Sequence, residues 1–131
     1  MFLEHVNLTV TDLDRSIAFY GDLLDLRVRW RGKTTDGAAA AHVGDDRCYL
    51  AMFQATESGA PDSDYGRPGI NHFGFVVDDL DLVRRRLRAA GVQPHLEQDY
   101  EPGHRLYFLD PDGIEVELVQ YRSNEAPLQD R

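Results

Sequence analysis

Hydrophobic and polar residues alternate at the start of the chain in a way that is typical of a half-buried strand. Within residues 5–10, Val6, Leu8 and Val10 share one face and polar side chains share the other. Beyond Asp12, which suits a helix N-cap, the apolar period lengthens to three and four residues. This change predicts an amphipathic helix whose buried stripe is formed by Leu13, Ile17, Tyr20 and Leu24.

The same pattern occurs a second time, at a constant offset of 67 residues. His5 falls on His72 at this offset, and Leu8 falls on Phe75. An internal repeat of this kind indicates two copies of one structural unit. The second helix is expected to begin after Asp78 or Asp79 and to end before Gly91, with a stripe formed by Leu80, Val83, Leu87 and Ala90.

Three short runs typical of strands follow each helix. A stretch rich in Gly, Pro, Ser and Asp, residues 55–69, separates the two sets and suits a linker. We therefore predict one α+β domain made of tandem βαβββ modules, at about 3–55 and 70–121, joined by the 55–69 linker and followed by a flexible tail at 122–131. The strands are expected near 26–31, 38–43, 47–54, 93–98, 105–109 and 114–120.

The composition and net charge limit the kinds of molecule that the protein is expected to bind. The 131 residues are 42% hydrophobic and carry a formal net charge of −9, which fits a globular domain with a core of its own. The main basic cluster, at residues 84–88, lies on the second predicted helix, so neither nucleic acid nor a membrane is expected as a partner. Cys48 is the one cysteine, which excludes an internal disulfide and suits the cytoplasm.

Candidate chemistry first appears in the last predicted strand, "DPDGIEVELVQY". Two-residue alternation places Glu115 and Glu117 on one face, opposite Val116 and Leu118. If the apolar face packs on a helix, the glutamates are either solvated or directed into a concave sheet. Glu115 is expected at the rim of such a cavity or in water, and is assigned no role.

Three segments together resemble the vicinal oxygen chelate superfamily: "HVNLTVTDLDRSIAFYGDLLDL", "NHFGFVVDDLD" and "YFLDPDGIEVELVQ". This superfamily includes glyoxalase I, extradiol dioxygenases, fosfomycin-resistance thiol transferases and bleomycin-resistance proteins. The resemblance covers residues 4 to about 120. It implies curved mixed sheets that form a cavity around a divalent metal, a small-molecule substrate and a homodimer.

The resemblance also implies a metal site formed by His5, His72 and Glu117. The fourth family position falls on Leu50 at constant offset, or on Ala51 if "VELVQ" is matched to "LAMFQ", and neither side chain binds a metal. The strand pattern agrees, because all three predicted ligands lie opposite apolar neighbours. Two imidazoles and one carboxylate leave coordination positions open and favour Fe(II), with Mn(II), Zn(II) or Ni(II) as alternatives.

Three activities of the family fit to different degrees. Glyoxalase I uses metal-bound glutamates from both modules, and the first is missing here. Thiol transferases use a threonine where this chain has Asn7, and their serine loop has no counterpart. Extradiol dioxygenases carry a tyrosine ten residues before the glutamate, and Tyr107 has this spacing from Glu117. They also carry a histidine several residues upstream of the tyrosine, and His95 lies somewhat too far upstream to match it.

We therefore expect a metal-dependent, dioxygenase-like enzyme in which Tyr107 and Glu117 are catalytic. Strand packing is an equally good explanation for Tyr107. The rest of the substrate pocket is expected to include Asn7, Thr9, Trp30 and Phe53. The rival hypothesis is a metal-free binding protein of the bleomycin-resistance type, whose cationic cargo would suit the acidic composition.

Overall fold

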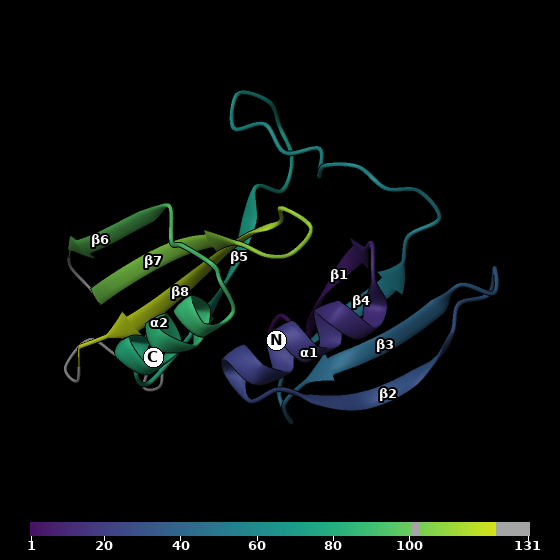
Figure 1. Cartoon of the computed structure of the whole chain (residues 1–131), viewed down its shortest axis with the longest axis horizontal. Helices are drawn as coiled ribbons and strands as arrows, with labels where there is room; N and C mark the ends of the chain where they lie inside the picture. Colours follow the sequence, from purple (N-terminus) through teal and green to yellow (C-terminus); the bar gives the residue numbers. More distant parts are fainter. Residues whose placement is uncertain (101–102, 123–131) are drawn as a thin grey trace. The chain divides into compact units, whose positions relative to one another are not determined.

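The computed structural model describes residues 1–100 and 103–122, so the predicted tail lies outside the described residues except for Arg122 (Figure 1). The chain divides into two compact units, Met1–Ala60 and Pro61–Arg131. The predicted linker contributes its first residues to one unit and the remainder to the other. Among the helices in the described part of the chain, none is both long and apolar enough to cross a membrane.

The N-terminal unit is one four-stranded mixed sheet with a helix packed on β3 and β4. Its strand order is β1-β4-β3-β2, in which β1 runs parallel to β4 and the other neighbours are antiparallel. The elements are β1 (His5–Val10), α1 (Leu13–Leu24), β2 (Arg27–Lys33), β3 (Ala39–Gly44) and β4 (Tyr49–Gln54).

The C-terminal unit repeats this arrangement, with the order β5-β8-β7-β6 and a helix packed on β8 (Figure 1). Again the first and last strands are parallel neighbours. The predicted α+β class and the two βαβββ modules are confirmed. The elements are β5 (His72–Val76), α2 (Leu80–Ala89), β6 (Leu96–Tyr100), β7 (Gly103–Leu109) and β8 (Glu115–Tyr121).

The alternating strand pattern separates the two faces of each sheet. Side chains on the helix-facing side are buried, including Val10 and Met52 in one unit and Leu118 in the other. Burying such side chains contributes roughly 1.5–3 kcal/mol each. The opposite face carries the polar residues of interest: His5, Asn7 and Thr9 in β1 are exposed.

Several details of the predicted elements differ, and Ala90, predicted to end the buried stripe of the second helix, is exposed and follows α2 as its C-cap. Ser16 and Leu23 are fully buried on α1, whereas Ile17 and Leu24 are only half-buried, so the stripe is rotated slightly around the helix. β6 begins at Leu96 rather than at residue 93. Pro94 supplies the reason, because it has no N–H to donate to the antiparallel ladder.

Each helix begins with two side-chain acceptors. Asp12 and Asp79 act as N-caps, accepting from Arg15 N and Leu82 N respectively. A second acceptor comes from the last strand of the same sheet and occupies the first helical N–H, which would otherwise lack a partner. Gln54 Oε1 accepts from Leu13 N at 2.9 Å, and Gln120 Oε1 accepts from Leu80 N at 2.8 Å.

The turn before β8 is held by a buried carboxylate. Asp110 is 5% exposed and accepts from the backbone N–H groups of Asp112 and Ile114 at 2.8 and 2.9 Å. Gly113 has φ +82, a conformation that residues with a side chain rarely adopt. This turn determines where β8 starts and hence where its two glutamates lie.

The glutamine acceptors generate a stability prediction. Replacement Gln120→Ala leaves the half-buried N–H of Leu80 unsatisfied and is expected to lower the free energy of unfolding by about 1–2 kcal/mol. Urea denaturation monitored by circular dichroism measures it. The control Gln98→Ala, at an exposed position of β6, should change stability by less than about 0.5 kcal/mol. Equal effects of the two substitutions would contradict the capping role.

Candidate functional site

A cluster of polar side chains lies on the face of the C-terminal sheet that points away from α2. His72 begins β5, and Glu115 and Glu117 come from the adjacent β8. Tyr107 of β7 is paired with Glu117 in the antiparallel ladder. The Glu115 and Glu117 side chains are 18% and 12% exposed, so neither is a freely solvated strand residue.

His72 and Glu117 form the centre of this cluster. His72 Nε2 lies 3.1 Å from Glu117 Oε2. The other carboxylate oxygen, Oε1, accepts from Arg105 Nη1 at 2.6 Å, which holds the orientation of the Glu117 side chain. The Tyr107 ring meets the His72 ring edge-on, with 5.5 Å between centroids. Predicted residues His72, Glu117 and Tyr107 are therefore brought together.

Glu115 is surrounded by hydrogen-bond donors. Tyr65, from the predicted linker, donates its hydroxyl proton to Glu115 Oε1, and His95 Nε2 lies 2.8 Å from Glu115 Oε2. Burial raises the pKa of Glu115, but these hydrogen bonds outweigh it and leave the pKa below its ordinary value. The bond to Glu115 in turn raises the pKa of Tyr65 to about 12.

Sequence reasoning missed Tyr65 and His95 as members of the cluster. Nothing in the local pattern around Tyr65 distinguishes it within the linker. His95 stands far upstream of Tyr107, yet its N–H donates to the Tyr107 carbonyl at 3.0 Å and the ring centroids are 6.4 Å apart. The antiparallel pairing of β6, which begins directly after His95, with β7 therefore places His95 beside Tyr107.

The His72–Glu117 pair suits a metal ion by its donor chemistry and spacing. Two ligand atoms, each about 2.1 Å from an ion and at right angles, are about 3 Å apart. Gly74 is paired with Glu117, and a Cβ there would make only ordinary van der Waals contact with the Glu117 Cβ, at 3.4 Å. The residues present therefore fit two positions of a metal site.

A third ligand is not supplied within this cluster. Within residues 1–100 and 103–122, no group of three or more His, Cys, Asp and Glu side chains is arranged to hold a metal ion. His5, the third predicted ligand, belongs to the N-terminal unit, where its Nδ1 lies 2.9 Å from Glu4 Oε1. The structure thus brings together two of the three predicted ligands within one unit.

Strand register resolves which residue of the N-terminal unit corresponds to Glu117. Asn7 is paired with Ala51 in the first sheet, and Gly74, at the equivalent place in the repeat, is paired with Glu117 in the second. Ala51 rather than Leu50 is the counterpart. Its carbonyl accepts from Asn7 Nδ2 at 3.1 Å, so the fourth family position carries no carboxylate.

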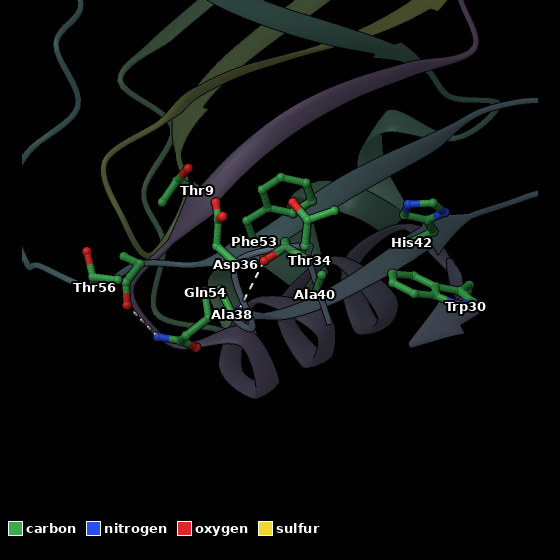
Figure 2. A pocket seen from close by; sticks show the side chains of 12 residues that line it. Thr9, Trp30, Thr34, Asp36, Ala38, Ala40, His42, Phe53, Gln54 and Thr56 are labelled. Carbon is green, nitrogen blue, oxygen red and sulfur yellow. Dashed lines mark hydrogen bonds between the residues drawn. The ribbon is translucent and has the colours of Figure 1, made fainter. Parts of the chain in front are cut away.

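The N-terminal unit contains a cavity of about 540 Å³ (Figure 2). Predicted pocket residues Thr9, Trp30 and Phe53 line it, whereas Asn7 is not among the lining residues. Trp30 and Phe53 are 43% and 36% exposed, which separates them from the buried core. Figure 2 shows Trp30 beside His42, with threonine hydroxyls on the other side of the cavity.

A row of aromatic rings connects this cavity to His5. His5 stacks on Tyr49 with 5.0 Å between centroids, and Tyr49 stacks on His42 at 4.5 Å. His42 then contacts Trp30 at 4.9 Å. Burial lowers the pKa of His42, which favours its neutral form near pH 7. The predicted ligand and the cavity therefore lie on one face of the same sheet.

Comparisons with known proteins agree with this architecture. Residues 2–118 match the model of the Glyoxalase/Bleomycin resistance protein/Dioxygenase superfamily. The chain is 35% identical over 119 residues to glutathione transferase FosA of Serratia marcescens, covering 88% of this chain and 78% of that protein. It is 28% identical to lactoylglutathione lyase of Haemophilus influenzae, covering 98% of both.

A solved structure supports the same relationship. The glyoxylase/bleomycin resistance protein/dioxygenase domain from Frankia sp. EAN1pec superposes with a TM-score of 0.79 at 31% identity, covering 94% of this chain and 93% of that one. The family match over nearly the whole chain, the paired βαβββ units and the polar strand faces lead to one conclusion. The chain belongs to the glyoxalase/bleomycin resistance protein/dioxygenase superfamily.

Proposed function

We propose that the chain is a divalent-metal-dependent enzyme acting on a small substrate that presents two adjacent oxygen atoms. His72 and Glu117 supply two of the metal ligands, and His5 is the third ligand that the family resemblance implies. The proposal depends on the 3.1 Å approach of His72 Nε2 to Glu117 Oε2 on a half-buried sheet face. Fe(II), Mn(II), Zn(II) and Ni(II) all suit these donors.

When bound, the metal would supply Lewis acidity, stabilising negative charge on the substrate oxygens. The chain's own residues do the positioning. Arg105 fixes Glu117 through its 2.6 Å hydrogen bond. The Tyr107 phenol, beside His72, donates a hydrogen bond to the substrate oxygen that gains charge. The N-terminal unit offers a separate cavity, lined in part by Trp30 and Phe53, that could hold an organic group.

Among the family's reactions, addition of a thiol to a small electrophile has the best support. The similarity to glutathione transferase FosA favours it over the dioxygenase-like activity expected from the ligand set alone. Ala51 weighs against a proton transfer that needs a metal-bound glutamate from each unit. In thiol addition a carbon–sulfur bond forms as a carbon–oxygen bond breaks, and the departing oxygen takes up the proton released by the thiol.

A dioxygenase is the second candidate, and a specific observation favours it. His95 lies beside Tyr107, in contact with Glu115. A histidine near the tyrosine supplies the acid–base group whose apparent absence weakened this hypothesis.

Metal binding tests the proposal directly. Glu117→Gln removes one anionic ligand and should weaken binding of Mn(II) or Zn(II) by more than the roughly 10–100-fold that outer-shell changes cost. Elemental analysis and competition with a chromophoric chelator measure this. The control Glu57→Gln, an exposed linker change, should bind as the wild type does. If the wild-type protein takes up no divalent metal, the metal-free binding protein becomes the better hypothesis.

Substrate assays separate the two candidate reactions. With metal bound, we expect consumption of glutathione in the presence of small oxygen-containing electrophiles, and Tyr107→Phe should lower kcat by about 10²–10³-fold. Tyr121→Phe, which removes a phenol at the far end of β8, is the control. Oxygen uptake with a catechol, without thiol consumption, would instead support the dioxygenase.

Trp30 is the chain's one tryptophan and reports on the cavity. Substrate binding should change its fluorescence emission, because a bound molecule would replace water beside the indole. Trp30→Leu should raise KM about three- to tenfold through loss of aromatic contact. The control Val28→Ala alters an exposed apolar residue of the same strand that does not line the cavity. Equal KM values in all three proteins would place the substrate elsewhere.

A further inference from the structure

We propose that the cavity of the N-terminal unit binds a protonated amine that carries an apolar body, such as an arylalkylammonium ion. Asp36 binds the ammonium group, and Phe53 and Trp30 contact the apolar body. All the residues that line the cavity belong to the N-terminal unit, so the site needs neither a metal nor the C-terminal cluster. The inference goes beyond the proposed function and does not depend on it.

The side chains that line the cavity carry negative charge. Asp36 is the one acidic residue among them, and they include neither lysine nor arginine. Burial lowers the pKa of His42, the other titratable side chain of the wall, so its imidazole is mostly neutral near pH 7. Within the described part of the chain, the Asp36 carboxylate has no hydrogen-bond or ion-pair partner. A cationic ligand supplies that partner.

The turn between β2 and β3 determines where this carboxylate lies. Thr34 closes the turn, because its N–H donates to Ala38 O at 2.8 Å and its hydroxyl oxygen accepts from Ala38 N at 3.1 Å. Gly37, with φ +87, donates its N–H to Thr34 O at 3.0 Å. Asp36 therefore projects from a hydrogen-bonded turn. Figure 2 shows it on the same side of the cavity as Thr9, away from Trp30.

Two features of β2 direct the Trp30 ring into the cavity. The register shifts between Val28 and Trp30, so the strand has one extra residue there, a β-bulge. Trp30 consequently pairs with His42, whereas regular alternation from Val28, the partner of buried Val43, would turn Trp30 toward the helix-covered face. The second feature is Gly32, where a Cβ would lie 2.4 Å from the Trp30 ring. A side chain at this position would push the indole away.

The wall between the Asp36 side and the Trp30 side is apolar. Phe53 is paired with Ala40 of β3, and both residues line the cavity. The Phe53 and Trp30 rings are 36% and 43% exposed, so their surfaces are available to a ligand. Aromatic rings accept apolar groups and also tolerate a nearby cation, because their faces carry negative potential.

The charge near Trp30 has the opposite sign and orients the ligand. The Arg29 guanidinium lies over the Tyr49 ring, 4.6 Å from its centroid, and Tyr49 stacks on His42 in the cavity wall. A positive charge at this place disfavours an ammonium group beside it. The ammonium group is therefore placed at Asp36, with the apolar body directed toward Trp30.

Three probes of similar shape test the charge preference: 4-phenylbutylamine, 4-phenyl-1-butanol and 4-phenylbutyrate. Each is titrated into the full chain at pH 7 with a metal chelator present, while the emission of Trp30 is followed. The amine should bind about tenfold more tightly than the alcohol, because a charge-assisted hydrogen bond adds to the shared apolar contacts. The butyrate should bind more weakly than the alcohol. Alcohol or butyrate binding as tight as that of the amine would overturn the proposal.

A pair of charge-matched variants locates the binding site. Asp36→Asn should reduce the affinity for the amine to about that of the alcohol and leave the alcohol affinity unchanged. The control Asp22→Asn removes the same charge from an exposed position of α1 that does not line the cavity, and should leave the amine affinity unchanged. Equal losses in the two variants would indicate attraction by the net charge of the chain and would contradict the site.

Gly32→Ala tests the aromatic wall separately from the carboxylate. Displacing the Trp30 ring should weaken binding of the amine and of the alcohol alike, by about three- to tenfold, and should keep the preference for the amine. Unchanged affinities would contradict the role given to Trp30. Circular dichroism checks that each variant is folded. None of these measurements uses a metal or turnover, so failure of this inference and failure of the proposed function are distinguishable.

Discussion

The parallel pairing of the first and last strands in each unit is the constraint on which the site depends. In the C-terminal sheet it pairs His72 with Glu115, and it pairs Gly74, two residues further along β5, with Glu117. Parallel neighbours cannot be joined by a tight turn, and in this chain a helix and two further strands intervene. His72 and Glu117, which meet at the centre of the cluster, are consequently 45 positions apart in sequence.

The duplicated scaffold carries unequal chemistry in its two copies. Ala51 stands where the second unit has Glu117, and register places His42 opposite Ala51 as Tyr107 is placed opposite Glu117. The second sheet face is rich in ionisable groups, whereas the first combines stacked rings with a cavity. The two sheets therefore share one topology but differ in the chemistry of the face that points away from the helix.

Much of this could be predicted from the sequence because it follows from periodicity. Residue alternation placed His5, His72 and Glu117 on the faces away from the helices, and the repeat placed both N-caps. The ambiguity between Leu50 and Ala51 could not be resolved in this way, since a shift of one residue reverses the face of every side chain. Hydrogen-bond register was needed to decide it. The contacts of Tyr65 with His72 and Glu115 could not be predicted, because they depend on the path of a segment without periodic structure.

That path has an evolutionary consequence. Loops between folded units ordinarily tolerate insertions and deletions, since each added residue costs little conformational entropy. Here the stretch from Tyr65 to His72 spans a fixed gap, because the phenol at one end touches the imidazole at the other. Insertions and deletions should therefore accumulate before residue 65, and the segment of seven residues from there to His72 should keep its length.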